Sequence, residues 1–233
     1  MPKEMRQERP SFPITVGNIY FCLIKSRNNN SIEYEDVVYS VPTAKTIGLT
    51  QNTAEQDIWA SGEIYEAMVR TNYATISLST VSLPQHLVNA IEGAESIDGI
   101  TINKTSDVEK EFAFGFWAEN NDGSYQCFWL PVCKLTPTEK SYATRTADLP
   151  DPEVSYSVRG IPYNNIWRIK FSSADAKLYG ITPPERQYFA EKFFLSPMYE
   201  MSQLQSLISE YRTGTGDASV AFAPLSTTKT KKD

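Results

Sequence analysis

The sequence predicts a mainly β fold of the α+β class, in which strands form the core and helices are few. Short runs rich in β-branched and aromatic residues alternate apolar and polar positions, and an Asp-Gly pair separates two aromatic runs. Helical spacing is confined to one internal segment and to the residues after 171. The length of 233 residues fits one large domain, or one domain with a modest appendage. A content of 41% hydrophobic and 21% charged residues is typical of a globular chain.

The N-terminal part is predicted to begin with a flexible arm and to continue in a strand. Residues 1–12 alternate charges between prolines, which indicates an arm, and residues 14–25 form an apolar run rich in β-formers. Residues 32–50 alternate only weakly and contain Pro42, so we expect an edge strand or an extended loop there. Because long segments without a core pattern often serve contacts, residues 32–65 are a candidate contact arm.

A strand over residues 66–83 is expected to lead into a short helix over residues 84–92. Pro84 suits the first helical position, and Gly93 suits a C-terminal cap because glycine accepts a left-handed backbone. His86 lies in the first turn of this helix without a metal-ligating neighbour. We therefore expect His86 to be a structural residue at or near the surface.

The strongest local signal is an aromatic hairpin between residues 112–118 and 125–130. Asp122-Gly123 lies between the two runs, and glycine accepts the positive φ that such turns demand. Apolar side chains occupy both faces of the hairpin. We therefore expect it to be covered on both sides, by the short helix on one and by another sheet or another chain on the other.

Two further strands and two helices complete the pattern. Residues 154–159 and 166–171 alternate as strands, which brings the expected total to about seven. Pro183-Pro184 opens a predicted helix over residues 184–194. A second helical stripe ends before Gly214 and consists of Met201, Leu204, Leu207, Ile208 and Tyr211.

These elements suggest four regions along the chain. The arm of residues 1–12 precedes a β domain over residues 13–171. Residues 172–225 are interpreted as a C-terminal extension packed on that domain. Residues 226–233 are polar and rich in lysine, and they are expected to be disordered.

Charge and hydropathy exclude several classes of protein. A formal net charge of −6 argues against a free-standing nucleic-acid binder, whose affinity comes from lysine and arginine. No apolar run approaches the roughly 20 residues of a membrane span, so no membrane association is expected. The charged N-terminus lacks the apolar core of a signal peptide, which predicts a protein that stays where it is made.

The rare residues offer little for catalysis. One histidine and three cysteines without a CxxC spacing predict no metal site, and no glycine-rich phosphate loop is present. We therefore expect no cofactor and no enzymatic activity. The odd number of cysteines indicates buried thiols in a reducing compartment, although a disulfide between Cys127 and Cys133 remains open.

Two compositional features could carry a function. Aromatic residues make up 12% of the chain, and they could stack on sugars or serve the core and a subunit interface. Residues 92–122 hold eight carboxylates against two lysines, a balance equal to the whole net charge. This window could be a solvated face, a calcium site or a glycosidase pair, or a surface that repels a polyanion. The DxDxDG spacing of calcium loops is absent from it.

The order of several weak motifs resembles the major tail proteins of long-tailed phages that infect Gram-positive bacteria. Residues 17–21 resemble the family's G-x-N-x-Y-Y start, and residues 58–66 resemble its Y-A-D-N segment, with Ser61 and Gly62 in place of Asp and Asn. The resemblance covers roughly residues 14–171. Its other parts are the strand at 76–78, Leu83-Pro84 with the helix ending at Gly93, the aromatic hairpin, the segment 128–135 followed by Thr144, and the strand that follows Pro152-Glu153.

This resemblance implies a tail-tube-type β-sandwich or barrel with a flanking short helix and a partly helical C-terminal extension. It implies a virion protein, assembled in the host cytoplasm as hexameric rings that stack around a tape measure protein, and joined by tail terminator and distal tail proteins. Viral DNA would pass through the tube without specific binding. A carbohydrate-binding β-sandwich module is the alternative. Candidate subunit-interface residues are Tyr39, Ile47, Ile58, Trp59, Ile64 and Tyr65, and candidate lumen-facing acidic residues are Glu95, Asp98, Asp107 and Glu109.

Overall fold

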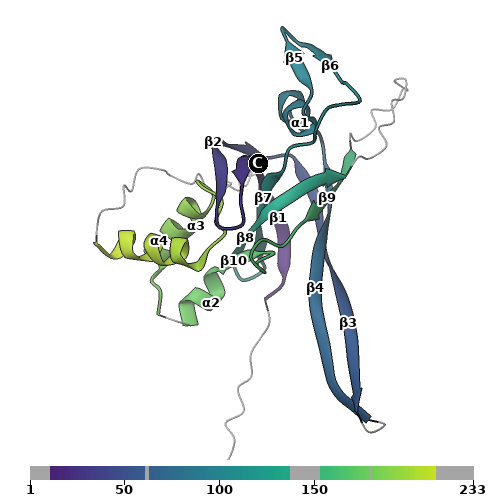
Figure 1. Cartoon of the computed structure of the whole chain (residues 1–233). Helices are drawn as coiled ribbons and strands as arrows, with labels where there is room; N and C mark the ends of the chain where they lie inside the picture. The colour runs from purple at the N-terminus through teal and green to yellow at the C-terminus, as the bar shows by residue number, and fades with distance from the viewer. Residues whose placement is uncertain (1–10, 61–62, 137–152, 179, 214–233) are drawn as a thin grey trace, which may run out of the picture.

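A computed structural model describes residues 11–60, 63–136, 153–178 and 180–213 of the chain. Most of the predicted N-terminal arm and the whole predicted tail over residues 226–233 lie outside the described residues. The described chain is mainly β, as predicted, with one large antiparallel sheet and a few short helices (Figure 1). Among the described residues, no helix is both long and apolar enough to cross a lipid bilayer.

The large sheet has eight strands in the order β2-β1-β7-β8-β9-β4-β3, and β10 pairs with β8 beside this path. Two short strands, β5 and β6, form a separate hairpin. The strands are β1 (Pro13–Arg27), β2 (Ile32–Val41), β3 (Ala44–Ala60), β4 (Glu63–Thr80), β5 (Glu95–Ile97), β6 (Ile100–Ile102), β7 (Phe112–Asn120), β8 (Tyr125–Thr136), β9 (Val154–Gly160) and β10 (Ile169–Ser172).

The sheet curls around a single large apolar core. Side chains from β1, β7 and β8 share this core with side chains from β4 and β9, although β1 and β4 are far apart in the strand order. A flat sheet would keep these strands apart, so the shared core requires strong curvature. The curl also brings β1 close to β3, with which it is not hydrogen-bonded. The largest side chains of this core include Phe21, Ile76, Leu78, Phe112, Phe114 and Leu130.

The predicted short helix is confirmed as α1 (Gln85–Glu92), and it closes one opening of this core. Its Leu87, Val88 and Ile91 side chains are buried against the strands. Gly93 ends the helix with φ of 72°, the left-handed conformation expected of a C-terminal glycine. His86 is exposed, and its ring lies 5.7 Å from the Tyr39 ring.

The aromatic hairpin is confirmed as β7 and β8. Phe116 lies opposite Phe128, and Gly115 lies opposite Trp129. The prediction that a second sheet or another chain covers the outer face is wrong, because helices of the same chain cover it. Trp129 packs there against Phe193, and its indole N–H donates a hydrogen bond to the Phe193 carbonyl.

Three helices follow the sheet in the chain. The helices predicted near residues 184–194 and 201–211 are confirmed as α3 (Pro183–Phe193) and α4 (Met201–Thr213). The Thr182 and Glu185 side chains cap the start of α3 reciprocally. A further short helix, α2 (Ser173–Leu178), was not predicted. The buried residues of α3 and α4 form one apolar cluster with the outer face of β1, β7 and β8.

Several strand predictions need correction. The described residues contain ten strands, not about seven, because residues 32–60 form two strands and a hairpin follows α1. The strand expected over 66–83 begins earlier and ends at Thr80. The strand expected over 166–171 begins only at Ile169, because Asn164 and Asn165 adopt positive φ values of 49° and 65° in a tight turn.

All three cysteines are free and buried, so the disulfide between Cys127 and Cys133 does not form. Cys127 belongs to the cluster under the C-terminal helices, whereas Cys133 belongs to the central core on the other face of the sheet. The register shift between Phe112 and Phe114 in the β7–β8 pairing accompanies this change of face.

Gly115→Ala should lower the free energy of unfolding by about 1–3 kcal/mol, because overpacking strains a filled core. A Cβ atom at Gly115 would lie 2.9 Å from the buried Trp129 ring. Gly48→Ala is the matched control, since its nearest neighbour would be the Ser77 Cβ at 3.6 Å. Urea denaturation of the two variants and the wild type measures the difference. Equal free energies for the two variants would contradict the close approach of Trp129.

The protein should lose stability above about pH 9. Burial raises the pKa of the Cys22 thiol to about 11, with smaller contributions from Glu35 and Asp36, and burial also raises the pKa of Tyr20 and of Tyr125 to about 12. Each raised pKa favours the neutral form in the folded protein. This stabilisation is complete below the unfolded pKa values and is lost as the pH rises through the interval between unfolded and folded values. Urea midpoints should therefore fall steadily between about pH 9 and 12, and a flat profile would contradict the burial of these groups.

Candidate functional site: the assembly surfaces of the sheet

The longest feature of the molecule is the two-stranded ribbon formed by β3 and β4. The two strands pair along their whole length, from Ala44 opposite Thr80 to Ala60 opposite Glu63. β4 pairs with β9 only over Ala74–Thr80, so the rest of the ribbon has no third strand among the described residues. Figure 1 shows the ribbon extending well beyond the sheet. An isolated two-stranded ribbon is marginally stable in water, so this one is suited to packing against a partner.

Both faces of the free part of the ribbon carry exposed apolar side chains. Tyr65 is 77% exposed and lies at a register shift between β3 and β4, and Val69 is 66% exposed. Alternation along β4 places Val69 on one face of the ribbon. Met68, which is 46% exposed, lies on the other face. Ile58 lies opposite Glu66, which is two positions before Met68, so Ile58 and Met68 share a face. Apolar groups on both faces are unusual for a surface element and are typical of an interaction site.

The six predicted interface residues fall in two different places. Tyr39 and Ile47 are half-buried against the central core of the same chain. Ile58 and Tyr65 lie on the free part of the ribbon and are exposed. Trp59 and Ile64 pair with each other at its end, and their side chains lie outside the described part.

Sequence reasoning missed Met68 and Val69 on the ribbon. Both lie within residues 66–83, which the sequence analysis expects to form a strand and not part of the contact arm. The signal that could have found them is the absence of a clear alternation between residues 64 and 71, where apolar residues fall on both faces.

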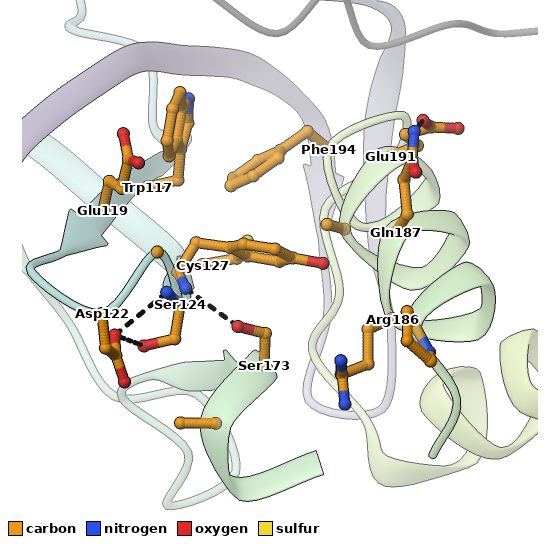
Figure 2. A pocket seen from close by; sticks show the side chains of 15 residues that line it. Trp117, Glu119, Asp122, Ser124, Cys127, Ser173, Arg186, Gln187, Glu191 and Phe194 are labelled. Atoms are coloured by element: carbon orange, nitrogen blue, oxygen red, sulfur yellow. Dashed lines mark hydrogen bonds between the residues drawn. The ribbon is translucent and has the colours of Figure 1, made fainter. Parts of the chain in front are cut away.

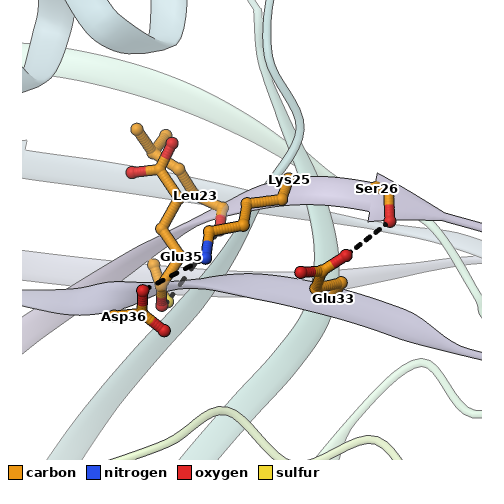
Figure 3. A network of polar contacts seen from close by, with 7 residues as sticks. Leu23, Lys25, Ser26, Glu33, Glu35 and Asp36 are labelled. Carbon is orange, nitrogen blue, oxygen red and sulfur yellow. Dashed lines mark hydrogen bonds and ion pairs between the residues drawn. The ribbon is translucent and has the colours of Figure 1, made fainter.

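The two edges of the sheet differ in charge. The edge strand β2 carries Glu33 and Asp36, which accept hydrogen bonds from Ser26 and Lys25 of β1 at 3.1 Å each (Figure 3). Charged groups on an edge strand disfavour pairing with a further strand. At the opposite edge, residues 46–54 of β3 include no charged residue. The β3 edge is therefore the better suited to add a strand from another molecule.

The acidic window over residues 92–122 does not form one surface. Glu111 lies 3.0 Å from Arg27 and 3.6 Å from Lys134, in a surface cluster of charges. Glu119 and Asp122 lie near the turn between β7 and β8. Glu92 ends α1, and the other four carboxylates lie on or just after the hairpin of β5 and β6, which projects beyond α1 (Figure 1).

All four predicted lumen-facing residues lie on or just after this β5–β6 hairpin. Glu95 forms an ion pair with Lys104 at 2.7 Å, and Asp107 accepts a hydrogen bond from the Lys104 backbone N–H at 2.7 Å. Asp98 is exposed in the turn of the hairpin with φ of 51°, and Glu109 is exposed. Lys104 therefore brings Glu95 and Asp107 together.

The same hairpin presents an apolar face to solvent. Ile97 lies opposite Ile100, and Ile102 shares their face because it is two positions from Ile100. These three side chains are between 56% and 73% exposed. The opposite face carries Thr101, whose hydroxyl accepts a hydrogen bond from Asn89 of α1 at 2.7 Å. The face with Thr101 is thus turned inward, and the face with the three isoleucines, which also carries Glu95, is turned outward.

A cavity of about 640 Å³ lies between the β7–β8 hairpin and α3 (Figure 2). The strands contribute aromatic and acidic side chains, including Trp117 and Glu119, and the helix contributes Arg186 and Gln187. Ser173 accepts a hydrogen bond from the Tyr125 backbone N–H at 2.9 Å at its wall. Aromatic rings beside carboxylates and an amide can stack on a sugar ring and bind its hydroxyls.

No other chemistry is evident in the described residues. They contain no group of three or more His, Cys, Asp and Glu side chains that could hold a metal ion. Burial raises the pKa of each cysteine thiol, which disfavours the reactive thiolate.

Comparison with known proteins adds no assignment. No known protein family matches the sequence, and no curated protein matches it.

Proposed function

We propose that this protein is the major tail-tube subunit of a long-tailed phage and assembles into stacked hexameric rings. The single observation that carries the proposal is the free β3–β4 ribbon, with Ile58, Tyr65, Met68 and Val69 exposed on its two faces. The ordered series of motifs over residues 14–171 supports it, and so does the mainly β sheet with one short flanking helix. Within the proposal, the specific fold is the tail-tube-type sandwich or barrel.

The physical logic is that the free ribbon and the uncharged stretch of the β3 edge over residues 46–54 are completed by a neighbouring copy. The neighbour would cover the apolar side chains and would pair with the unsatisfied backbone groups of β3. This contact joins two different surfaces of the same chain, so it is heterologous. A heterologous contact repeated by rotation closes a ring, and rings that present two different ends can stack into a tube.

The charge of the protein suits a conduit for DNA. The exposed carboxylates of the β5–β6 hairpin are candidates to border the lumen, where negative charge would repel the phosphates of passing DNA. The tape measure protein would occupy the lumen during assembly, and terminator and distal tail proteins would bind the ends of the tube. The protein would then reside in the virion, without enzymatic activity, after assembly in the host cytoplasm.

Tyr65→Ser combined with Val69→Ser should abolish assembly while the monomer stays folded. Both side chains are exposed in the monomer, so its free energy of unfolding should change by less than about 0.5 kcal/mol. Leu195→Ser, at a residue 48% exposed in the C-terminal extension, is the matched control and should still assemble. Negative-stain microscopy and light scattering of concentrated protein measure the outcome. A wild-type protein that stays monomeric when concentrated and with virion partners present would overturn the proposal.

A carbohydrate-binding module is the second candidate, and the cavity beside α3 favours it. The cavity combines Trp117 and Phe194 with Glu119, Arg186 and Gln187, which is a suitable set of groups for a sugar. If this function is correct, the monomeric wild type should bind glycans on an array, and Gln187→Ala should weaken that binding. Gln205→Ala, at an exposed position of α4 outside the cavity, should not. Absence of glycan binding by the monomer would remove this candidate.

A further inference from the structure

The curled sheet has two outward faces, and they differ in chemistry. The outer face of β1, β7 and the first half of β8 is apolar and is covered by α3 and α4. The outer face of β3, β4, β9 and the last residues of β8 lies on the other side of the central core (Figure 1). Three rows of residues cross this second outward face, which we call the hydroxyl face.

Strand register defines the hydroxyl face. Eight of its eleven residues are serine or threonine, and none of the eleven is acidic or a large apolar residue. One of them, Ser79, is buried and donates a hydrogen bond to the Glu153 carboxylate at 2.6 Å. Residues between them along the strands, such as Ile76, Leu78 and Val158, point into the central core. The three rows are Gly48, Ser77, Ser157 and Thr136; Thr50, Thr75, Arg159 and Lys134; and Thr46, Ser79 and Ser155.

The two cations of this face already have partners. The Lys134 ammonium lies 3.6 Å from a carboxylate oxygen of Glu111. The Arg159 guanidinium lies 4.1 Å above the Tyr73 ring. Among the eleven residues that define it, the face therefore offers few free positive charges to a polyanion and no apolar patch to hold a protein.

We infer that the hydroxyl face lines the lumen of the assembled tube, as the wall along which DNA slides. This inference rests on the proposed function and deepens it. In a ring, one outward face of each sheet can border the channel. The other outward face is covered by α3 and α4, so the hydroxyl face is the one left to border the channel. A wall of short hydroxyl side chains releases few counterions from DNA, so the polyanion passes without adhering. The acidic β5–β6 hairpin is a separate candidate and does not enter this argument.

Cysteine labelling of assembled tubes tests the inference. Ser77→Cys places a thiol on the hydroxyl face, and Gln205→Cys places one on the exposed side of α4. The three native cysteines give little background because they are between 0% and 1% exposed. In monomers, both introduced thiols should react with a small maleimide and with a maleimide on a large polymer. In tubes, Ser77→Cys should lose its reaction with the polymer reagent and keep its reaction with the small one, whereas Gln205→Cys should keep both.

Each other outcome has a definite meaning. Tubes in which Ser77→Cys still reacts with the polymer reagent place the face outside, and tubes in which it reacts with neither reagent place it in a subunit contact. Either result overturns the inference and leaves the proposed function standing. If the wild type forms no tubes at all, the proposed function fails and the inference fails with it. Thr50→Cys, at an exposed residue of the same face, replaces Ser77→Cys if that variant alone does not assemble.

Discussion

The curl of one antiparallel sheet around a shared apolar core is the constraint on which the rest of the structure depends. It brings β1, β7 and β8 against β4 and β9, and α1 closes the space between them. Each strand points one row of side chains into this core. The rows on the other side of the strands form two outward faces, one on each side of the core. One of these faces is apolar and holds the C-terminal helices, and the other is lined with hydroxyl groups.

The same constraint leaves two apolar surfaces uncovered by other described strands or helices. The core ends where β9 stops pairing with β4, at Ala74, yet β3 and β4 continue as a pair. Beyond that point, no strand or helix of the described chain covers Tyr65, Met68 or Val69. The β5–β6 hairpin also lacks a covering element on one face, because Thr101 contacts α1 and the isoleucines on the opposite face are exposed to water. Two exposed apolar surfaces on one chain are more typical of a subunit of an oligomer than of an isolated module.

Elements whose ends are set by local chemistry were predictable. Asp122-Gly123 between two aromatic runs marked the β7–β8 hairpin, and Pro84 and Gly93 marked α1, because each of these residues restricts or permits particular backbone angles. The β5–β6 hairpin was missed, since its strands of three residues are too short to show a period and its turn lies in a charged window. Of the six candidate interface residues, Ile58 and Tyr65 lie exposed on the ribbon and Tyr39 and Ile47 lie half-buried against the core, because apolar residues in a weak pattern can pack in the core or on a surface.

The sequence by itself determined the β class, the aromatic hairpin, the short helix and the two longer C-terminal helices, because these depend on contacts between near neighbours and on backbone preferences. Only the tertiary structure decided that α3 and α4 cover Trp129, that the acidic window is divided among separate places, and that rows rich in serine and threonine align across three or four strands. Those outcomes depend on strand order and register between residues far apart in the chain. A period of two along one strand specifies which residues share a face, but it does not specify what that face meets.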